Sequence, residues 1–444
     1  MYNLEELVSK IEQKRNGKTI LYVSNEVEHG VGLSDYLENV IHICLKHSNT
    51  VDYLKEEGKT VICFDSDIPN HTARSSADLL QIIPTLKEQG IVSDGDYVQT
   101  FKISPKFEFE AETHKLVILN TSSELNQLFE RKVSQANLFE KELVCIPKTR
   151  IGQLDTFSYD DCAEYFGNKF VIQFDRGHTG SGTRFISSEE EFKPISEKFP
   201  KRSVRISEYV EGDTYSVNCC MSSSGVLIGG IYRQITGIPE LTSNRGGTVG
   251  GTFQHGLLGS QLDALGVELL KIEKLLGNYS YKGLFGLDFI VSDDTVYIIE
   301  MNARQQMTVA FNSHINVMQK IPPLNLLHIA VFLGIDTFEI EEINRYSTRE
   351  IHAGQLYLRN THDSVLKVSH EKKTGVYSLE TGEFIKTSYQ FSDCSEGEIL
   401  LLTQLKGTSI KPEGEVARIQ GRNLLDENGF PLKSYIDFLT RINQ

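Results

Sequence analysis

GLFGLDFIVSDDTVYIIEMNARQ, residues 283–305, decides the fold because it contains two strand-like runs on either side of the polar turn SDDT. With a three-residue loop over 293–295, the antiparallel register places Asp288 directly opposite Glu300. Alternate residues of a strand share a face, so Asn302 lies on the same side as Glu300. The stretch therefore predicts a β-hairpin on which two carboxylates and one amide oxygen converge.

Paired acids on one face of a hairpin need a group that neutralises their charge. Like charges directly opposite each other are unfavourable unless something neutralises them. Mg²⁺ does so with one or two carboxylates together with substrate phosphates. Asp288, Glu300 and Asn302 are therefore candidate metal ligands, and the alternative is an exposed polar face with solvated acids. Arg304, two residues beyond Asn302, could hold a phosphoryl group or a carboxylate bidentately, or could neutralise the acids in a salt bridge.

A second hairpin is predicted around a glycine-rich loop. KFVIQF (169–174) and TRFIS (183–187) are strand-like and flank the sequence DRGHTGSG. Glycine lets backbone N–H groups approach phosphates closely, so this loop is a candidate flap over a nucleotide. It is not a P-loop, because no Gly-Lys-Ser/Thr precedes a helix, and a plain flexible hairpin is the alternative. The candidate phosphate-binding residues are Gly177, Gly180, Ser181 and Gly182.

A strand-to-turn segment follows the glycine hairpin. RSVRISEYVEGDTYSVNCCM (202–221) contains an apolar strand that carries Glu208, followed by Tyr209, Val210 and a Glu-Gly-Asp turn. The order along the chain is then glycine-rich hairpin, Glu-aromatic-aliphatic-x-Gly, and acidic hairpin with Glu-x-Asn. This ordered triple is far more specific than any one of its members.

A second glycine-rich stretch, residues 231–256, lies between this segment and the acidic hairpin. It contains Arg233 and Arg245. A flexible loop with arginines suits a lid over an acyl phosphate or an acceptor, and a disordered surface loop is the alternative.

The ordered triple resembles the ATP-grasp superfamily of ligases, over residues 130–338 and more loosely over the whole chain. In that family the nucleotide lies between two α+β subdomains that follow an N-terminal α/β domain. The resemblance implies a site for ATP and Mg²⁺ (or Mn²⁺). It implies that Lys132 and the glycine loop contact the phosphates, although a solvated helix lysine is the alternative for Lys132. Glu208, Tyr209 and Val210 would contact the adenine, and Asp213 would contact the ribose. Metal ligation is implied for Asp288, Glu300 and Asn302, and catalysis for Arg304, Arg233 and Arg245.

Two positions depart from the family pattern. The strand before the glycine loop normally ends in a lysine that grips the α- and β-phosphates, and the matching residue here is Gln173. Either Gln173 hydrogen-bonds a phosphate, or Arg176 or Arg184 supplies the charge. At the ribose position Thr214 stands where glutamate is usual, so Asp213 is expected to substitute.

The whole chain fits an α/β and α+β architecture with three domains. Strand-like and helix-like runs alternate over 18–120, which is typical of a parallel sheet covered by helices. We therefore expect an N-terminal parallel-sheet α/β domain over 1–130 and an ATP-grasp domain with two subdomains around its nucleotide site over 131–338. Short strand signals with turns predict a small β-rich C-terminal module over 339–444.

Composition limits the function classes. The 444 residues carry a net charge of −15, so coating of nucleic acid or of anionic membrane is not expected. The seven cysteines show no CxxC pair, the polar N-terminus does not resemble a signal peptide, and no apolar run approaches membrane-spanning length. A reduced, cytoplasmic setting is therefore expected.

The main functional hypothesis is an ADP-forming carboxylate–amine ligase. The resemblance implies that ATP activates an amino acid or peptide carboxylate as an acyl phosphate, which an amine converts to an amide. Small-molecule substrates are expected, and a homodimer is one option. One alternative acceptor is the thiol of a carrier protein, for which Lys201, Arg202 and Arg205 are a small candidate basic patch. Another alternative is a catalytically inactive, nucleotide-binding regulatory protein, which Gln173 would suit.

Overall fold

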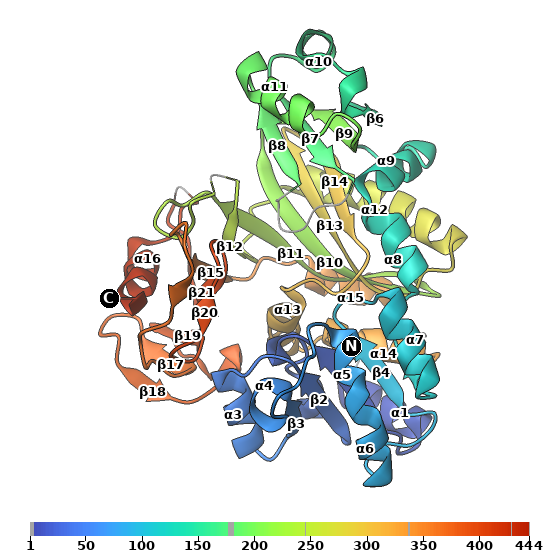
Figure 1. The fold of residues 1–444 in the computed structure, drawn as a ribbon, viewed down its shortest axis with the longest axis vertical. Helices are drawn as coiled ribbons and strands as arrows, with labels where there is room; N and C mark the ends of the chain where they lie inside the picture. The colour runs from blue at the N-terminus through green and yellow to red at the C-terminus, as the bar shows by residue number, and fades with distance from the viewer. Residues whose placement is uncertain (1–3, 176–181, 245, 336–337, 428, 444) are drawn as a thin grey trace.

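The computed structural model describes residues 4–175, 182–244, 246–335, 338–427 and 429–443. Their strands form a five-stranded, a four-stranded and a ten-stranded sheet and a two-stranded ribbon. Figure 1 shows the four-stranded sheet at one end of the molecule, the five-stranded sheet at the other, and the C-terminal strands at the side. The predicted α/β and α+β architecture is confirmed. None of the helices in the described ranges is long and apolar enough to cross a membrane.

The N-terminal region is built on a parallel sheet, as the alternation of strand-like and helix-like runs predicts. Its central strands are apolar, rich in β-branched residues and buried on both faces, which is typical of a sheet covered by helices. The strand order is β3 (Thr60–Cys63), β2 (Val40–Cys44), β1 (Ile20–Ser24), β4 (Tyr97–Thr100) and β5 (Val117–Ile118). Its helices are α1 (Leu4–Arg15), α2 (Leu33–Tyr36), α3 (Asn49–Glu56), α4 (Phe64–Asp67), α5 (Ser76–Leu79), α6 (Ile83–Glu88), α7 (Pro105–Thr113) and α8 (Ser123–Glu130).

The four-stranded sheet is antiparallel, with the order β6 (Thr149–Gln153), β9 (Ser203–Glu208), β7 (Phe170–Phe174) and β8 (Thr183–Ile186). One face buries Phe170 and Ile206 in a core beneath two helices. Because side chains alternate across a strand, Gln173 and Arg205 point to the other face. The two covering helices are α10 (Tyr159–Phe166) and α11 (Glu189–Lys198), and α9 (Lys132–Lys141) packs beside β9.

The ten-stranded sheet joins the middle of the chain to its C-terminal part, because β12 pairs with β15. The domain boundary expected at 338/339 stays a prediction, since one sheet contains strands from both sides of it. The strand order is β14 (Thr295–Asn302), β13 (Gly283–Ser292), β10 (Asp213–Ser222), β11 (Gly225–Thr236), β12 (Thr248–Thr252), β15 (Ala353–Arg359), β21 (Glu415–Arg422), β19 (Glu398–Thr403), β17 (Gly375–Ser378) and β18 (Phe384–Lys386). The ribbon pairs β16 (Leu366–Lys367) with β20 (Ser409–Ile410).

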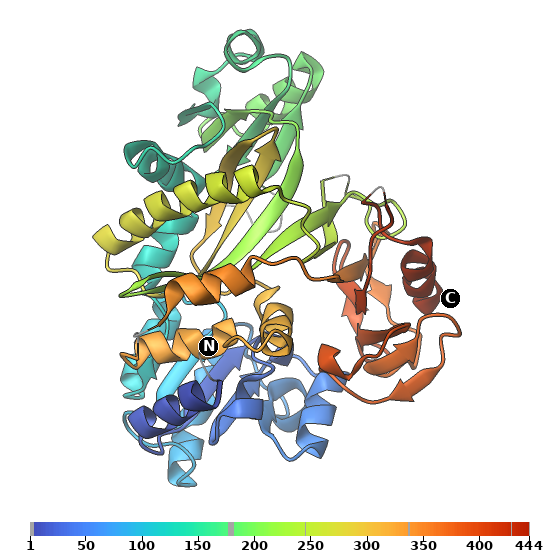
Figure 2. The same ribbon diagram turned by 180° about the vertical axis from the view of Figure 1, so that it is seen from behind.

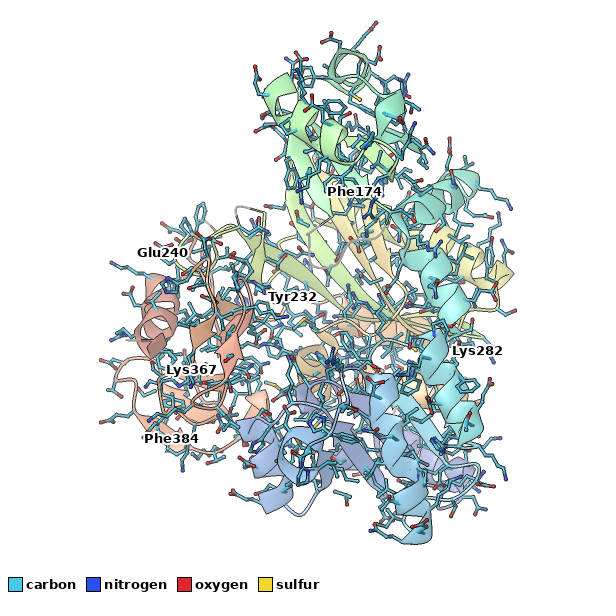
Figure 3. The ribbon with its side chains drawn as sticks, viewed as in Figure 1. Phe174, Tyr232, Glu240, Lys282, Lys367 and Phe384 are labelled. Atoms are coloured by element: carbon cyan, nitrogen blue, oxygen red, sulfur yellow. The ribbon has the colours of Figure 1, made fainter. Side chains whose placement is uncertain are left out.

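Two parts of the stretch 231–256 are strands, and the described residues between them, 237–244 and 246–247, lie outside any strand, so a lid stays a prediction for that connection only. Residues 231–236 end β11 and residues 248–252 form β12, and the two strands pair antiparallel with each other. The two glycines within β12, Gly250 and Gly251, allow close packing. A Cβ on Gly251 would lie 2.4 Å from the ring of Tyr232, which Figure 3 labels near the middle of the molecule.

In the described part of the chain after β12, five helices pack against the ten-stranded sheet or beside it. Leu324 and Leu327 of α14 (Leu324–Phe332) belong to the same core as Leu7 and Ile20, so α14 bridges the sheet and the N-terminal region. Figure 2 shows this helix between the two, and the long helix α12 along the back of the sheet. These helices are α12 (Gly259–Asn278), α13 (Val309–Met318), α14 (Leu324–Phe332), α15 (Ile340–Ser347) and α16 (Lys433–Thr440).

Candidate active site

The acidic hairpin has the predicted pairing but reaches it through a different turn. Asp288 lies directly opposite Glu300, as expected. The three-residue loop is wrong, because Ser292 pairs with Thr295 and leaves a two-residue turn whose first residue has a φ of 52°. A β-bulge next to Phe289 then shifts the register by one residue and restores the predicted pairing.

Asp288 accepts hydrogen bonds from three polar side chains. Ser216 Oγ and Gln234 Nε2 donate to its Oδ1, the second over 3.2 Å. Asn302 Nδ2 donates to its Oδ2 over 3.1 Å. Burial and the nearby charge of Glu300 raise the pKa of Asp288 to about 6. The surrounding groups therefore compensate the negative charge of the pair only in part.

Lys132 lies beside this carboxylate pair and not in solvent. It is the first residue of α9, it is buried, and its Nζ lies 2.5 Å from Glu300 Oε1. Gln135, in the same turn of the helix, donates to the backbone oxygen of Met301 over 2.8 Å and so ties α9 to β14. The alternative of a solvated lysine is thus wrong, while the contact of Lys132 with a phosphate stays a prediction.

Arg304 is held next to the hairpin by two hydrogen bonds and one ion pair. Its guanidinium donates to Asn302 Oδ1 over 3.1 Å and to the backbone oxygen of Gln305 over 3.0 Å. Its Nε lies 2.9 Å from Glu130 Oε1 at the end of α8. The salt bridge expected as an alternative role therefore forms with Glu130 rather than with the acids of the hairpin. The guanidinium also lies 5.4 Å from the centre of the Phe101 ring.

Residues of the N-terminal region lie next to Arg304 and Gln305. His29 stacks on Phe101 with ring centroids 4.1 Å apart, and its backbone oxygen accepts a hydrogen bond of 2.6 Å from Gln305 Nε2. Burial lowers the pKa of His29 to about 4, so the ring is neutral near pH 7. A small pocket beside it is lined by residues of both parts, among them Gln99, Asn120, Arg304 and Gln305. A molecule bound at Arg304 would therefore also meet the N-terminal region.

The residues expected around the adenine and ribose lie at the junction of β9 and β10. Glu208 Oε1 accepts a hydrogen bond of 2.7 Å from the backbone N–H of Lys148, and Tyr209 is 41% exposed. Asp213 is exposed and forms an ion pair with Arg233 over 3.0 Å. Their contacts with a nucleotide, and that of Val210 beside them, stay predictions.

The structure describes only part of the predicted glycine-rich loop and of the predicted arginines. Gly182 and its flanking strands β7 and β8 are described, and the two strands pair antiparallel as the glycine hairpin requires. Arg233 lies on β11 and not on a lid. The following residues lie outside the described ranges: Arg176, Gly177, Gly180, Ser181 and Arg245.

Two residues of the site escape a purely sequence-based prediction. Ser216 on β10 and Gln234 on β11 hold Asp288 and also bond to each other over 2.6 Å. The alternation within β10 limits Ser216 to one of two faces, but it does not tell which strand lies next to it. Only the pairing of β10 with β13 places Ser216 opposite Asp288.

The basic patch expected at 201–205 is not a surface patch. Arg205 is 1% exposed, and its guanidinium donates to the backbone oxygen of Ile299 over 2.9 Å. Lys201 Nζ lies 2.5 Å from Asp155 Oδ2. Because one cation is buried and a second is paired, this segment gives no support to the docking of an acidic carrier protein.

The hairpin and strands of both sheets around it lie in a segment that matches the ATP-grasp domain family. The match with the family model described as ATP-grasp domain covers residues 129–308. A curated relative, the carbamoyl phosphate synthase large chain of Saccharolobus solfataricus, is 26% identical over 257 residues, which cover 55% of this chain and 23% of the relative. The match therefore spans about a quarter of that relative's length.

Solved structures with a similar fold cover nearly the whole chain. A biotin carboxylase–βγ-ATP complex from Campylobacter jejuni has a TM-score of 0.61 at 15% identity, over 91% of this chain and 87% of its own. N5-carboxyaminoimidazole synthase from Aspergillus clavatus, in complex with ADP and 5-aminoimidazole ribonucleotide, has a TM-score of 0.61 at 11% identity, over 97% and 100%. An L-amino acid ligase from Bacillus licheniformis has a TM-score of 0.58 at 14% identity, over 95% and 97%. At these identities the likeness establishes a shared fold.

Proposed function

We propose that the protein is an ATP-dependent, ADP-forming ligase that joins a small-molecule carboxylate to an amine. The observation that carries the proposal is the acidic hairpin inside the ATP-grasp domain, where Asp288 lies directly opposite Glu300 with Asn302 beside them. Lys132 and Arg304 flank these acids. Paired acids with cations on either side suit a nucleoside triphosphate bound together with a divalent cation.

The oxygen donors of the hairpin fit Mg²⁺ or Mn²⁺. Within the described ranges no group of three or more His, Cys, Asp or Glu side chains that could hold a metal ion is found. Two carboxylates and the amide oxygen of Asn302 leave coordination positions for phosphate oxygens. The raised pKa of Asp288 supports this fit, because a cation would compensate the charge that burial makes costly. When bound, the metal would neutralise charge on the transferring phosphoryl group.

The first step of the proposed reaction makes an acyl phosphate. A carboxylate oxygen of the substrate attacks the γ-phosphorus of ATP, and the bond from that phosphorus to the β–γ bridging oxygen breaks to release ADP. Lys132 and Arg304 hold phosphoryl oxygens in position, and Glu300 and Glu130 keep these two cations oriented. Positioning and charge stabilisation carry this chemistry, so it requires no nucleophile from the protein.

The second step forms the amide. The amine nitrogen attacks the acyl carbon, the bond from that carbon to the phosphate oxygen breaks, and inorganic phosphate leaves while the nitrogen releases a proton to solvent. We place the amine on the side of the N-terminal region, because His29 and Phe101 adjoin Arg304 there.

An amino acid or peptide is the carboxylate substrate that we favour. The likeness to an L-amino acid ligase over 97% of that chain supports this choice. Bicarbonate is the second candidate, because a biotin carboxylase and a carboxyaminoimidazole synthase are also among the similar structures. The buried position of Arg205 removes the feature that favoured a carrier-protein acceptor.

The product pair from ATP tests the proposed reaction class. Purified protein with ATP, Mg²⁺ and pools of amino acids is expected to release ADP and phosphate only when a suitable carboxylate and amine are both present. A parallel arm replaces the carboxylate with bicarbonate and distinguishes the two substrate classes. Release of AMP and pyrophosphate would contradict the acyl-phosphate mechanism. Silence in every arm, with MgADP still bound, would favour the inactive regulatory alternative.

A further inference from the structure

Arg205 is a buried cation at the contact between the four-stranded and the ten-stranded sheets. It lies on β9, it is 1% exposed, and its guanidinium donates to the backbone oxygen of Ile299 on β14 over 2.9 Å. On the neighbouring strand β7, Gln173 lies directly opposite in the register, so the two side chains share a face. Figure 1 shows β7, β9 and β14 next to one another at this contact.

The guanidinium of Arg205 has fewer partners than its burial demands. Its Nε has no hydrogen-bond acceptor among the described residues. Arg15 is equally buried at 1% exposed, yet it donates to Glu12 Oε2 and to the backbone oxygen of Lys18, both over 2.6 Å. Folded proteins pair their buried charges, so an unpaired donor on a buried guanidinium calls for an explanation.

The local charges leave Arg205 without a counter-ion of its own. The nearby acid is Glu300, and one oxygen of Glu300 already lies 2.5 Å from Lys132 Nζ. Burial lowers the pKa of Arg205 to about 10, and the attraction of Glu300 offsets this effect only in part. Glu300 thus serves both Lys132 and Arg205, and an anion at Arg205 would give its guanidinium the partner that Nε lacks.

We propose that Arg205 binds the phosphates of the nucleotide and supplies the positive charge that Gln173 lacks. The inference rests on the proposed function, because that function places a nucleoside di- or triphosphate beside Glu300 and Lys132. Arg205 carries its positive charge on β9, directly opposite Gln173 of β7 and on the same face of the sheet. Neither Arg176 nor Arg184 is then needed for this role.

The test is Arg205→Met, which keeps an apolar stem of similar length and removes the charge. Isothermal titration is expected to show MgADP binding about 10- to 100-fold weaker than in the wild type, as for a lost charged hydrogen bond in a buried site. The melting temperature of the nucleotide-free variant is expected to equal or exceed the wild-type value, because removal of an undercompensated buried charge carries no net cost. Replacement of a residue with only a structural role would lower the melting temperature and leave the affinity for MgADP unchanged.

Arg15→Met is the matched control, since Arg15 is as buried but fully paired. It is expected to lower the melting temperature and to leave MgADP affinity unchanged. Adding Gln173→Lys to Arg205→Met is expected to restore much of the affinity, because it returns a cation to the same face of the sheet. Failure of this restoration would contradict a shared role for the two positions.

The outcomes separate this inference from the proposed function. Wild-type protein that binds no MgADP would contradict the proposed function itself. Wild-type binding with equally tight binding by Arg205→Met would overturn only the role of Arg205. A fall in the nucleotide-free melting temperature as large as that of Arg15→Met would assign Arg205 a structural role and would also overturn the inference.

Discussion

The Glu300→Gln variant is expected to lose about 10²–10³-fold in turnover, which is the scale of losing one preorganised charge at a transition state. Glutamine keeps the shape of the side chain but removes the negative charge that lies opposite Asp288 and beside Lys132. The site would lose one carboxylate ligand for the metal and the ion-pair partner of a buried lysine. The measurement is the initial rate of ADP release at saturating MgATP, with the substrates that the product assay identifies.

Asp294→Asn is the control for this change, because Asp294 lies in the turn of the same hairpin. There it accepts a hydrogen bond of 2.8 Å from Ser260 Oγ, away from the paired acids. Turnover of this variant is expected to stay close to that of the wild type. If Glu300→Gln kept its full rate while its melting temperature matched the wild type, the hairpin would not be the metal site.

The Arg304→Met variant is expected to lower kcat by about 10²-fold, with MgADP affinity nearly unchanged, because its charge acts on the group in transfer. Arg304 is oriented by Asn302 and Glu130 and faces the pocket toward the N-terminal region. ADP lacks the γ-phosphoryl group, so its binding does not report this interaction. The measurement is kcat from steady-state rates together with the dissociation constant of MgADP from titration.

Glu130→Gln probes how Arg304 is positioned. This change leaves the guanidinium charge in place but removes the carboxylate that lies 2.9 Å from its Nε. We expect a loss of kcat that is clearly smaller than that of Arg304→Met. An Arg304→Met variant with weaker MgADP binding and an unchanged kcat would make Arg304 a nucleotide-binding residue instead.

The acidic hairpin could be predicted from the sequence because its signal is local. Strand alternation places Glu300 and Asn302 on one face, and a short polar turn forces Asp288 to lie across from them. The details of the turn could not be predicted, because a two-residue turn with one bulge gives the same pairing as a three-residue turn without a bulge. The shorter turn and the bulge cancel each other, so the predicted pairing of Asp288 with Glu300 is confirmed although the predicted turn is wrong.

The role of glycine in 231–256 could not be predicted, because glycine serves two opposite purposes. In a loop it provides flexibility, and in a strand it allows another backbone or ring to come close. Here Gly251 makes room for the ring of Tyr232, and both residues belong to paired strands. A single sequence contains no signal for that tertiary contact.

The burial of the charged side chain of Arg205 could not be predicted from the sequence either. Its neighbours Lys201 and Arg202 in the sequence suggest a basic surface, and both of these residues are exposed. The face to which Arg205 points depends on which sheet lies against β9, and the contact with Ile299 on β14 buries it. This contact also weakens the inactive alternative, because the charge absent at Gln173 is present one strand away.

The central claim is that ATP activates a carboxylate as an acyl phosphate at the acidic hairpin. The most direct test supplies the carboxylate substrate labelled with ¹⁸O at both oxygens and examines the released inorganic phosphate by mass spectrometry. If the claim is correct, one labelled oxygen passes from the carboxylate to the phosphate in each turnover, and this transfer falls with the rate in Glu300→Gln. Unlabelled phosphate formed during amide synthesis, or label recovered in AMP, would contradict it.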